Sequence, residues 1–256
     1  MKILAYSDVH GNIDALNELQ KTADYCNADL RVFLGDAVMM CPYINECLES
    51  IWKSEDVFIL GNHDSYCAYG LPDEEKIFFK ADKKAHQAYM RNKTKKEYIE
   101  KLKTMPKEYS IVVDGIKLYF SHYAWETESY LYDDPDVYGV SSNKTAELFD
   151  KINADYIIFG HNHRPADFNY KGKHFVCVGS LGMKYPGNYI VINIENGKVS
   201  IEKKKINFDV NKLKQEMLKE NYPRAVSYAK WFNEEWLWFL KEHQVENLNL
   251  FSLQKS

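Results

Sequence analysis

The sequence predicts an α/β protein built around a parallel sheet. Short apolar runs at residues 3–6, 30–34 and 57–60 have the length of buried strands. Between them, residues 13–23 and 44–52 carry apolar side chains at helical spacing. Strands that alternate with helices in this order are joined by right-handed crossovers, so the three strands are expected to lie parallel.

Further strands are predicted in the second half of the chain. Segments 109–113 and 117–120 flank Asp114-Gly115, a dipeptide typical of a tight hairpin turn. Asn196-Gly197 predicts a second hairpin between two later strands. A helix is expected over 142–152, and strands are expected at 156–159, 175–178, 189–194 and 198–205.

Two other segments are predicted to be helical. Residues 72–106 are rich in Lys and Glu, and we expect them to form a helical insertion, either a solvated face or a lid over a site. The tail, over about 208–256, has an aromatic face that either packs on the chain's own core or forms a homo-oligomer contact. That face comprises Tyr228, Trp231, Phe232, Trp236, Phe239 and Leu240, with Trp238 on another side of the helix. No linker interrupts the chain, so residues 1–256 are predicted to form a single domain.

The composition excludes several classes of protein. Hydrophobic residues make up 45% of the 256 residues and charged residues 27%, which excludes a disordered or collagen-like chain. The net charge of -4 argues against nucleic acid as a partner. No apolar run reaches the length of a membrane span, so no membrane partner is expected. Five cysteines without Cys-x-x-Cys spacing indicate reduced thiols and a cytoplasmic location.

Clusters of polar residues follow five of the predicted strands, at the carboxyl end where open α/β sheets bind ligands. Their imidazole, carboxylate and carboxamide groups suit Mn, Fe, Zn, Co or Ni. Seven such groups are too many for one tetrahedral site, but they fit two metal ions that share a carboxylate and a bridging water. The clusters are Asp8-Val9-His10, Gly35-Asp36, Gly61-Asn62-His63-Asp64, Ser121-His122 and Gly160-His161-Asn162-His163.

On these motifs, the sequence resembles the calcineurin-like metallophosphoesterase superfamily over about residues 1–205. Residues 35–50 and Val178-Gly179-Ser180-Leu181-Gly182 resemble its small bacterial and archaeal branch. The resemblance implies an α/β (α+β) fold, a four-layer α-β-β-α sandwich. It also implies that His63 acts on the leaving oxygen, with Asp64 as its orienting partner. The implied metal ligands are Asp8, His10, Asp36 and His163 for one ion, and Asn62, His122 and His161 for the second, with Asp36 bridging.

The implied activity is hydrolysis of a phosphodiester or phosphoanhydride by a hydroxide that bridges two divalent ions, with Mn expected first. A nucleotide-type substrate is expected, for instance a dinucleoside polyphosphate, and Arg164 is a candidate contact to its phosphate. The aromatic residues Tyr123, Trp125, Tyr130, Tyr132 and Tyr138 either stack on a nucleobase or pack against the protein.

Two alternatives remain open at this point. One is a phosphomonoesterase or protein phosphatase, and the other is a metal-stabilised scaffold without catalysis. The chain has only four arginines, and after Asp36 it runs Ala37-Val38-Met39-Met40-Cys41-Pro42, where the phosphoprotein-phosphatase branch would have an Asp-Arg-Gly pattern. The sequence therefore offers few arginines for the bidentate clamp with which a phosphoprotein phosphatase would bind its substrate. A scaffold would have no need for the non-ligand His63.

Overall fold

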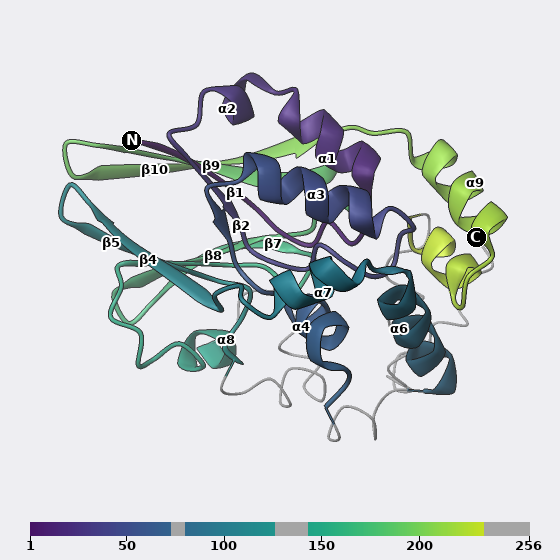
Figure 1. Cartoon of the computed structure of the whole chain (residues 1–256). Coiled ribbons are helices and arrows are strands. Elements are labelled where there is room, and N and C mark those ends of the chain that lie inside the picture. The colour runs from purple at the N-terminus through teal and green to yellow at the C-terminus, as the bar shows by residue number, and fades with distance from the viewer. Residues whose placement is uncertain (73–79, 126–142, 233–256) are drawn as a thin grey trace, which may run out of the picture.

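The computed structural model describes residues 1–72, 80–125 and 143–232, whose strands form two five-stranded sheets (Figure 1). The first sheet has the order β10-β9-β1-β2-β3, and the second has the order β4-β5-β6-β8-β7. The first comprises β1 (Lys2–Tyr6), β2 (Leu30–Phe33), β3 (Val57–Phe58), β9 (Gly187–Glu195) and β10 (Lys198–Ile206). The second comprises β4 (Glu108–Val113), β5 (Ile116–Ser121), β6 (Tyr156–Phe159), β7 (Pro165–Tyr170) and β8 (Lys173–Val178).

Each sheet has a parallel centre and antiparallel edges. Strands β1, β2 and β3 are parallel, and β9 and β10 extend this sheet in antiparallel fashion. Strands β5, β6 and β8 are parallel, while β4 and β7 are the antiparallel edges. The sequence pattern of the first three strands is therefore correct, but the polar clusters follow strands of two sheets instead of one.

Helices cover the outer faces of both sheets (Figure 1). Helices α1 (Ile13–Gln20), α2 (Ala23–Cys26) and α3 (Ile44–Ser54) lie on the first sheet. The short helix α8 (Asn143–Glu147) belongs to the layer on the second sheet. The remaining helices are α4 (Asn62–Tyr69), α6 (Ala81–Lys93), α7 (Lys96–Leu102) and α9 (Val210–Glu220), followed by helical residues 225–232.

The alternation of side chains along β1 shows why the layers form. Ile3 and Ala5 point into the apolar cluster between the two sheets, whereas Leu4 and Tyr6 point toward the helices. Burial on both faces explains the continuous apolar run in this parallel strand. The expected four-layer α-β-β-α sandwich is confirmed.

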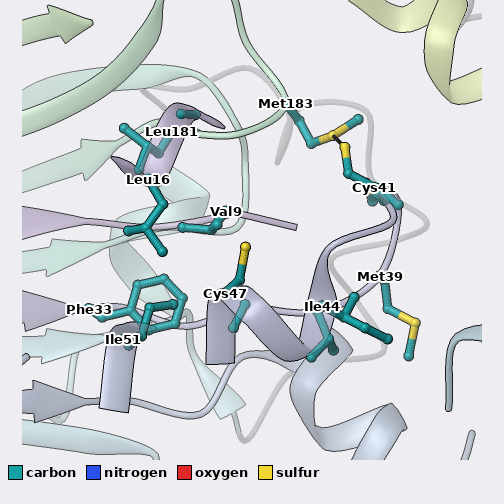
Figure 2. Packing of buried hydrophobic residues seen from close by; sticks show 14 of the residues in the cluster. Val9, Leu16, Phe33, Met39, Cys41, Ile44, Cys47, Ile51, Leu181 and Met183 are labelled. Atoms are coloured by element: carbon teal, nitrogen blue, oxygen red, sulfur yellow. Dashed lines mark hydrogen bonds between the residues drawn. The ribbon is translucent and has the colours of Figure 1, made fainter. Parts of the chain in front are cut away.

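The helix-facing core extends to the carboxyl ends of the strands. Figure 2 shows Phe33 of β2 beside Ile51 of α3, with Leu16 of α1 next to them. Further along the layer, Cys41 Sγ lies 3.6 Å from Met183 Sδ, and both side chains are fully buried (Figure 2). Apolar packing in the helix-facing core therefore supports the loops at the place where the polar clusters begin.

Several elements differ from those predicted, among them α2, α8 and β7. The helical pattern of residues 13–23 is broken at Thr22, whose hydroxyl donates to the Leu19 carbonyl and accepts from the Tyr25 amide, so that α2 begins anew. The helix expected over 142–152 ends at Glu147 in the described part. Strand β7 was not predicted, because its polar residues lack an apolar run and it begins with a proline.

The predicted insertion contributes α6 and α7, while residues 73–79 of it lie outside the described part. In the tail, Tyr228 is buried and Trp231 and Phe232 pack against the main core, as the first of the two interpretations expects. Residues Trp236, Trp238, Phe239 and Leu240 lie outside the described part, so a homo-oligomer contact stays a prediction. No helix in the described ranges is long and apolar enough to cross a bilayer.

A buried carboxyl at the end of α3 predicts a pH-dependent stability. Glu55 Oε1 accepts from the Tyr25 hydroxyl at 2.7 Å and the Tyr6 hydroxyl at 2.9 Å. Burial raises the pKa of Glu55 from 4.5 to about 7, and this outweighs the two hydrogen bonds. The folded state thus retains the proton to higher pH than the unfolded state. The resulting contribution to the free energy of unfolding is fully present below pH 4.5 and is lost as the pH rises through about 7.

We expect Glu55→Gln to remove this loss, because the neutral amide still accepts from both hydroxyls. The free energy of unfolding of the variant, relative to the parent chain, should rise by on the order of 1–3 kcal/mol between about pH 5 and about pH 8. Urea titrations at the two pH values measure it. Glu18→Gln, a control at a partly exposed residue of α1 that pairs with Lys21, should leave the pH dependence unchanged. An equal pH dependence in parent and Glu55→Gln would contradict the assignment.

Candidate active site

The five predicted clusters meet at the carboxyl ends of the strands. The loops after β1 and β2 are joined by several backbone hydrogen bonds, among them those from Asp8 N to Gly35 O and from His10 N to Asp36 O, each 2.9 Å long. In the second sheet, Gly160 N donates to His122 O, also at 2.9 Å. The two sheets are connected where His161 N donates to Asp8 Oδ2 at 3.1 Å.

The backbone at this junction is unusual. Five non-glycine residues have φ between 50° and 69°, in the left-handed region that L-residues rarely adopt: Asp8, His10, Asp36, His161 and His163. Such conformations concentrate at functional sites, because the surrounding structure has to stabilise them. Close packing adds a second constraint, since a Cβ on Gly61 would lie 2.1 Å from Asp36 Oδ1. Only glycine can precede Asn62 while Asp36 stays in place.

A first group of ligand atoms consists of Asp8, His10 and His163. Asp8 Oδ1 lies 3.2 Å from His163 Nε2 and 3.6 Å from His10 Nε2, and the two imidazole nitrogens are 3.0 Å apart. The other ring nitrogen of His10, Nδ1, faces the Val38 carbonyl at 3.0 Å. Because Nδ1 donates there, the lone pair of Nε2 is directed into the group.

A second group consists of Asp36, Asn62, His122 and His161. His122 Nε2 lies 3.3 Å from Asp36 Oδ2 and 3.0 Å from Asn62 Oδ1, and His161 Nδ1 also lies 3.0 Å from Asn62 Oδ1. His122 Nδ1 donates to the Leu34 carbonyl at 2.9 Å, which again directs Nε2 inward. Asp36 Oδ2 is 3.7 Å from His10 Nε2, so this carboxylate lies between the two groups.

The residues present fit divalent cations. Asp8, His10 and His122 are fully buried and Asp36 is 1% exposed. Asp8 Oδ1 is buried and has no hydrogen-bond partner within the described residues, although it is surrounded by imidazole nitrogens. A buried carboxylate oxygen without a donor is costly unless a cation compensates it. Nitrogen and oxygen donors of this kind suit transition metals and Zn.

The electrostatics of the cluster keep most of these ligands ready to bind. Burial raises the pKa of Asp36, but His122 and His63 lower it well below its usual range, and His163 does the same for the pKa of Asp8. Burial lowers the pKa of His161 to about 3, so its imidazole is neutral. Burial also lowers the pKa of His122, but Asp36 raises it to about 9 overall, so a cation at this position displaces a proton.

Residues 1–197 match the calcineurin-like phosphoesterase superfamily domain. The chain belongs to this superfamily. It is therefore a metallophosphoesterase, an enzyme that hydrolyses phosphate esters, and the family generally uses divalent metal ions.

The relatives of this metallophosphoesterase cover most of its length. It is 25% identical over 251 residues to an uncharacterised protein of Methanocaldococcus jannaschii, with 86% of this chain and 93% of that protein covered. A metallophosphoesterase from Sphaerobacter thermophilus superposes with a TM-score of 0.62 at 17% identity, over 90% of this chain and 98% of that one. A hypothetical protein from Pyrococcus horikoshii gives 0.68 at 15% identity, over 90% and 96%. Both similarities are similarities of fold.

His63 and Asp64 lie at the start of α4, and the structure places them differently from each other. His63 N donates to Asp36 Oδ1 at 2.8 Å, and the His63 ring lies edge-on to His10 at 5.2 Å between centroids. The Asp64 carboxylate was expected to orient His63. Instead it accepts from four backbone amides, those of Asp36, Ala37, Val38 and Gly61, at 2.7 to 3.2 Å.

The side chain at His63 Nδ1 is Gln87 of α6, whose Nε2 lies 3.1 Å away. No sequence motif marks Gln87, because it lies in a lysine-rich helix. By accepting from four backbone amides, Asp64 links the loops that follow β2 and β3 in the metallophosphoesterase site. Burial and the nearby Asp36 raise the pKa of Asp64 to about 7.

Aromatic rings flank the cluster on two sides. The Tyr123 ring stacks on His161 at 4.6 Å, and Trp231 of the tail lies 5.7 Å from the His163 ring. Trp231 was predicted only as part of the tail face, and its place beside a site residue was not foreseen. Arg164 is partly buried directly after His163. Tyr130, Tyr132 and Tyr138 lie outside the described part.

Proposed function

We propose that this metallophosphoesterase hydrolyses a phosphodiester or phosphoanhydride of nucleotide type, using two divalent metal ions. The observation that carries the proposal is the junction of two ligand groups at Asp8 and Asp36, with Asp8 Oδ1 buried and without a donor in the described part. We propose Mn as the metal ion, with Fe, Zn, Co or Ni as alternatives that the same donors accept.

In this proposal, each ion has its own set of ligands. The first set is Asp8, His10, Asp36 and His163, and the second is Asp36, Asn62, His122 and His161. When bound, two such ions lower the pKa of a water molecule and withdraw charge from a phosphoryl group. The carbonyls of Val38 and Leu34 hold the His10 and His122 rings in place, and Asp64 holds the loop that carries Asp36.

The substrate contacts follow from what surrounds the two groups. His63 interacts with the leaving oxygen, since its ring borders the first ligand group without belonging to it. Arg164 contacts a phosphate oxygen. Tyr123, stacked on His161, and Trp231, beside His163, offer ring faces to a nucleobase.

The arginine positions favour a diester or anhydride over a phosphoprotein. Arg31 pairs with Asp56 beside the start of β2, away from the site, and Arg224 pairs with Asp82 at 3.0 Å. Two of the four arginines are therefore already engaged in pairs within the fold, which leaves little for a bidentate clamp on a phosphorylated side chain.

Further parts of the proposal concern the whole chain. We propose that residues 1–256 form one domain with a helical insertion and a helical tail, and that the tail can mediate a homo-oligomer. The five thiols are all free, which suits the reducing cytoplasm. The mildly acidic chain favours a small-molecule substrate over nucleic acid.

The proposed function is tested on protein that has been treated with a chelator and reconstituted with Mn. We expect turnover of a nitrophenyl phosphodiester and of a diadenosine polyphosphate only after reconstitution, and slower turnover of nitrophenyl phosphate, a monoester. Bound metal, measured by elemental analysis, should approach two ions per chain. Full metal loading without turnover of any phosphate substrate would identify a scaffold and overturn the proposal. Faster turnover of the monoester would overturn the diester preference.

A further inference from the structure

We infer that Gln87, carried by the inserted helix α6, is a positioning residue that holds His63 as a neutral N–H donor toward the leaving oxygen, which selects phosphoanhydrides and other substrates whose leaving group is stable as an anion. The inference rests on the proposed function, because it assigns a substrate class to the same site. It gives the inserted helices a role in catalysis.

The contact is buried and directed. Gln87 is 7% exposed, and its Nε2 lies 3.1 Å from His63 Nδ1. Its other polar atom, Oε1, is buried and has no partner within the described ranges. Burying an amide oxygen unsatisfied costs free energy, so the hydrogen bond to His63 and the packing of the helix set the position of Gln87, and no partner of Oε1 does.

The helix that carries Gln87 is itself anchored to the site. The neighbouring residue His86 accepts from the Met40 amide at 3.1 Å, in the loop that follows Asp36. Its other ring nitrogen faces the Pro223 carbonyl of the tail at 2.9 Å. Two adjacent residues of α6 therefore bond in different directions, one to the metal-site loop and the tail, the other to His63. The two hydrogen bonds of His86 thus fix the position of α6, and therefore of Gln87, relative to the site.

The backbone and the side chain of His63 have separate supports. Its amide donates to Asp36 Oδ1 at 2.8 Å, which fixes the start of α4. The ring is held at Nδ1 by Gln87 and lies edge-on to His10 and Tyr66, with centroids 5.2 and 5.6 Å away. Only Gln87 makes a hydrogen bond to the ring among the described residues.

An amide donor at this place determines which nitrogen carries the hydrogen. Because Gln87 Nε2 donates, His63 Nδ1 accepts, and the ring hydrogen is on Nε2. A carboxylate in the same place would accept from Nδ1 and stabilise a positive ring. With Gln87, the hydroxide adds to phosphorus, the P–O bond breaks, and its electron pair stays on the leaving oxygen. His63 donates a hydrogen bond to that oxygen and keeps its hydrogen.

This arrangement favours some leaving groups over others. The phosphate released from a phosphoanhydride, or a nitrophenolate, is stable as an anion and needs only a hydrogen bond. An alkoxide needs a proton, which a neutral imidazole with no carboxylate behind it supplies poorly. The substrate class favoured here is the phosphoanhydride.

Three variants test the inference: Gln87→Met, which keeps length and loses the donor; Gln87→Glu, which supplies an acceptor; and Asn92→Met. Asn92 is an exposed amide on the same helix and serves as the control. Nitrogen-15 NMR of histidine-labelled, metal-free protein should show the His63 hydrogen on Nε2 in the parent chain and on Nδ1 in Gln87→Glu. A parent chain with the hydrogen on Nδ1 overturns the inference, whatever the variants do.

Kinetics on two phosphodiesters that differ only in the leaving group complete the test. One releases nitrophenolate and the other releases phenolate, whose conjugate acid has a pKa of about 10, like tyrosine. We expect Gln87→Met to lower kcat by about 10–100-fold at full metal loading, with KM within about threefold, and more on the phenyl ester. Gln87→Glu should regain most of kcat on the phenyl ester. Equal kinetics of Gln87→Met and Asn92→Met would overturn the inference alone, whereas a metal-loaded parent chain without turnover would overturn the proposed function.

Discussion

Substitution of Asp36 by Asn is expected to reduce hydrolysis by more than about 10³-fold and to lower metal content together with it. Loss of a residue behind a ligand typically costs 10–100-fold in metal affinity or activity, so loss of a carboxylate proposed to join both ions should cost more. Its Oδ2 lies 3.3 Å from His122 Nε2 and 3.7 Å from His10 Nε2, and Asn would retain its shape without its charge. Elemental analysis and turnover of a nitrophenyl phosphodiester measure both effects.

Asp24→Asn provides the matched control. Asp24 pairs with Lys2 at 2.9 Å and accepts from the Tyr189 hydroxyl at 3.1 Å, at the opposite end of the first sheet. This variant removes a carboxylate from a polar contact of similar length and should retain metal content and turnover. Full metal content in Asp36→Asn would contradict the role proposed for this carboxylate.

Replacement of His63 by Ala is expected to lower kcat by about 10²–10⁴-fold while metal content stays near that of the parent chain. The His63 ring borders the ligand cluster, but its Nδ1 faces Gln87 and no ligand atom. The substitution should therefore affect catalysis and leave metal binding intact. A phosphoanhydride should suffer less than a phenyl ester, because its leaving group depends less on hydrogen-bond donation. Steady-state kinetics with both substrates measure this.

His174→Ala is the control for that prediction, since His174 of β8 bonds to Asp167 at 2.6 Å, and Asp167 also pairs with Lys203 of β10, outside the ligand cluster. We expect it to leave kcat unchanged. Loss of metal in His63→Ala would show that His63 is a ligand and would remove it from the leaving-group role.

The residues of the site could be predicted from the sequence more completely than the arrangement of the strands that carry them. The clusters around Asp8, Asp36 and His161 are recognisable because each follows a buried apolar run, and strand ends of parallel sheets converge. Their division between two sheets could not be predicted in the same way, since strand pairing depends on contacts between residues more than 100 positions apart, such as Ile3 with Ile192. The pattern of apolar residues within one strand does not indicate which other strand it pairs with.

Gln87 and Asp64 show a second limit. Gln87 reaches His63 because α6 packs beside the site, and no residue near it in the chain indicates this. Asp64 follows His63 directly, and this proximity in the chain led to its prediction as the partner of that ring. The helix start turns its carboxylate toward four backbone amides instead, because the orphan amides of adjacent loops need an acceptor. Side-chain direction at a helix start depends on the neighbouring loops.

The junction of the two sheets also has a consequence for how the molecule comes apart. Asp8 and Asp36 extend from one sheet, and His122 and His163 extend from the other. In the proposed site, Asp8 and His163 would hold one cation and Asp36 and His122 the other, so each cation would link two halves whose strands belong to separate sheets. Slow-exchanging amides of β2 and β6 would then open together in the loaded protein, because neither sheet could unfold alone without releasing the ion. A catalytic centre in this position also makes the two halves a single cooperative unit.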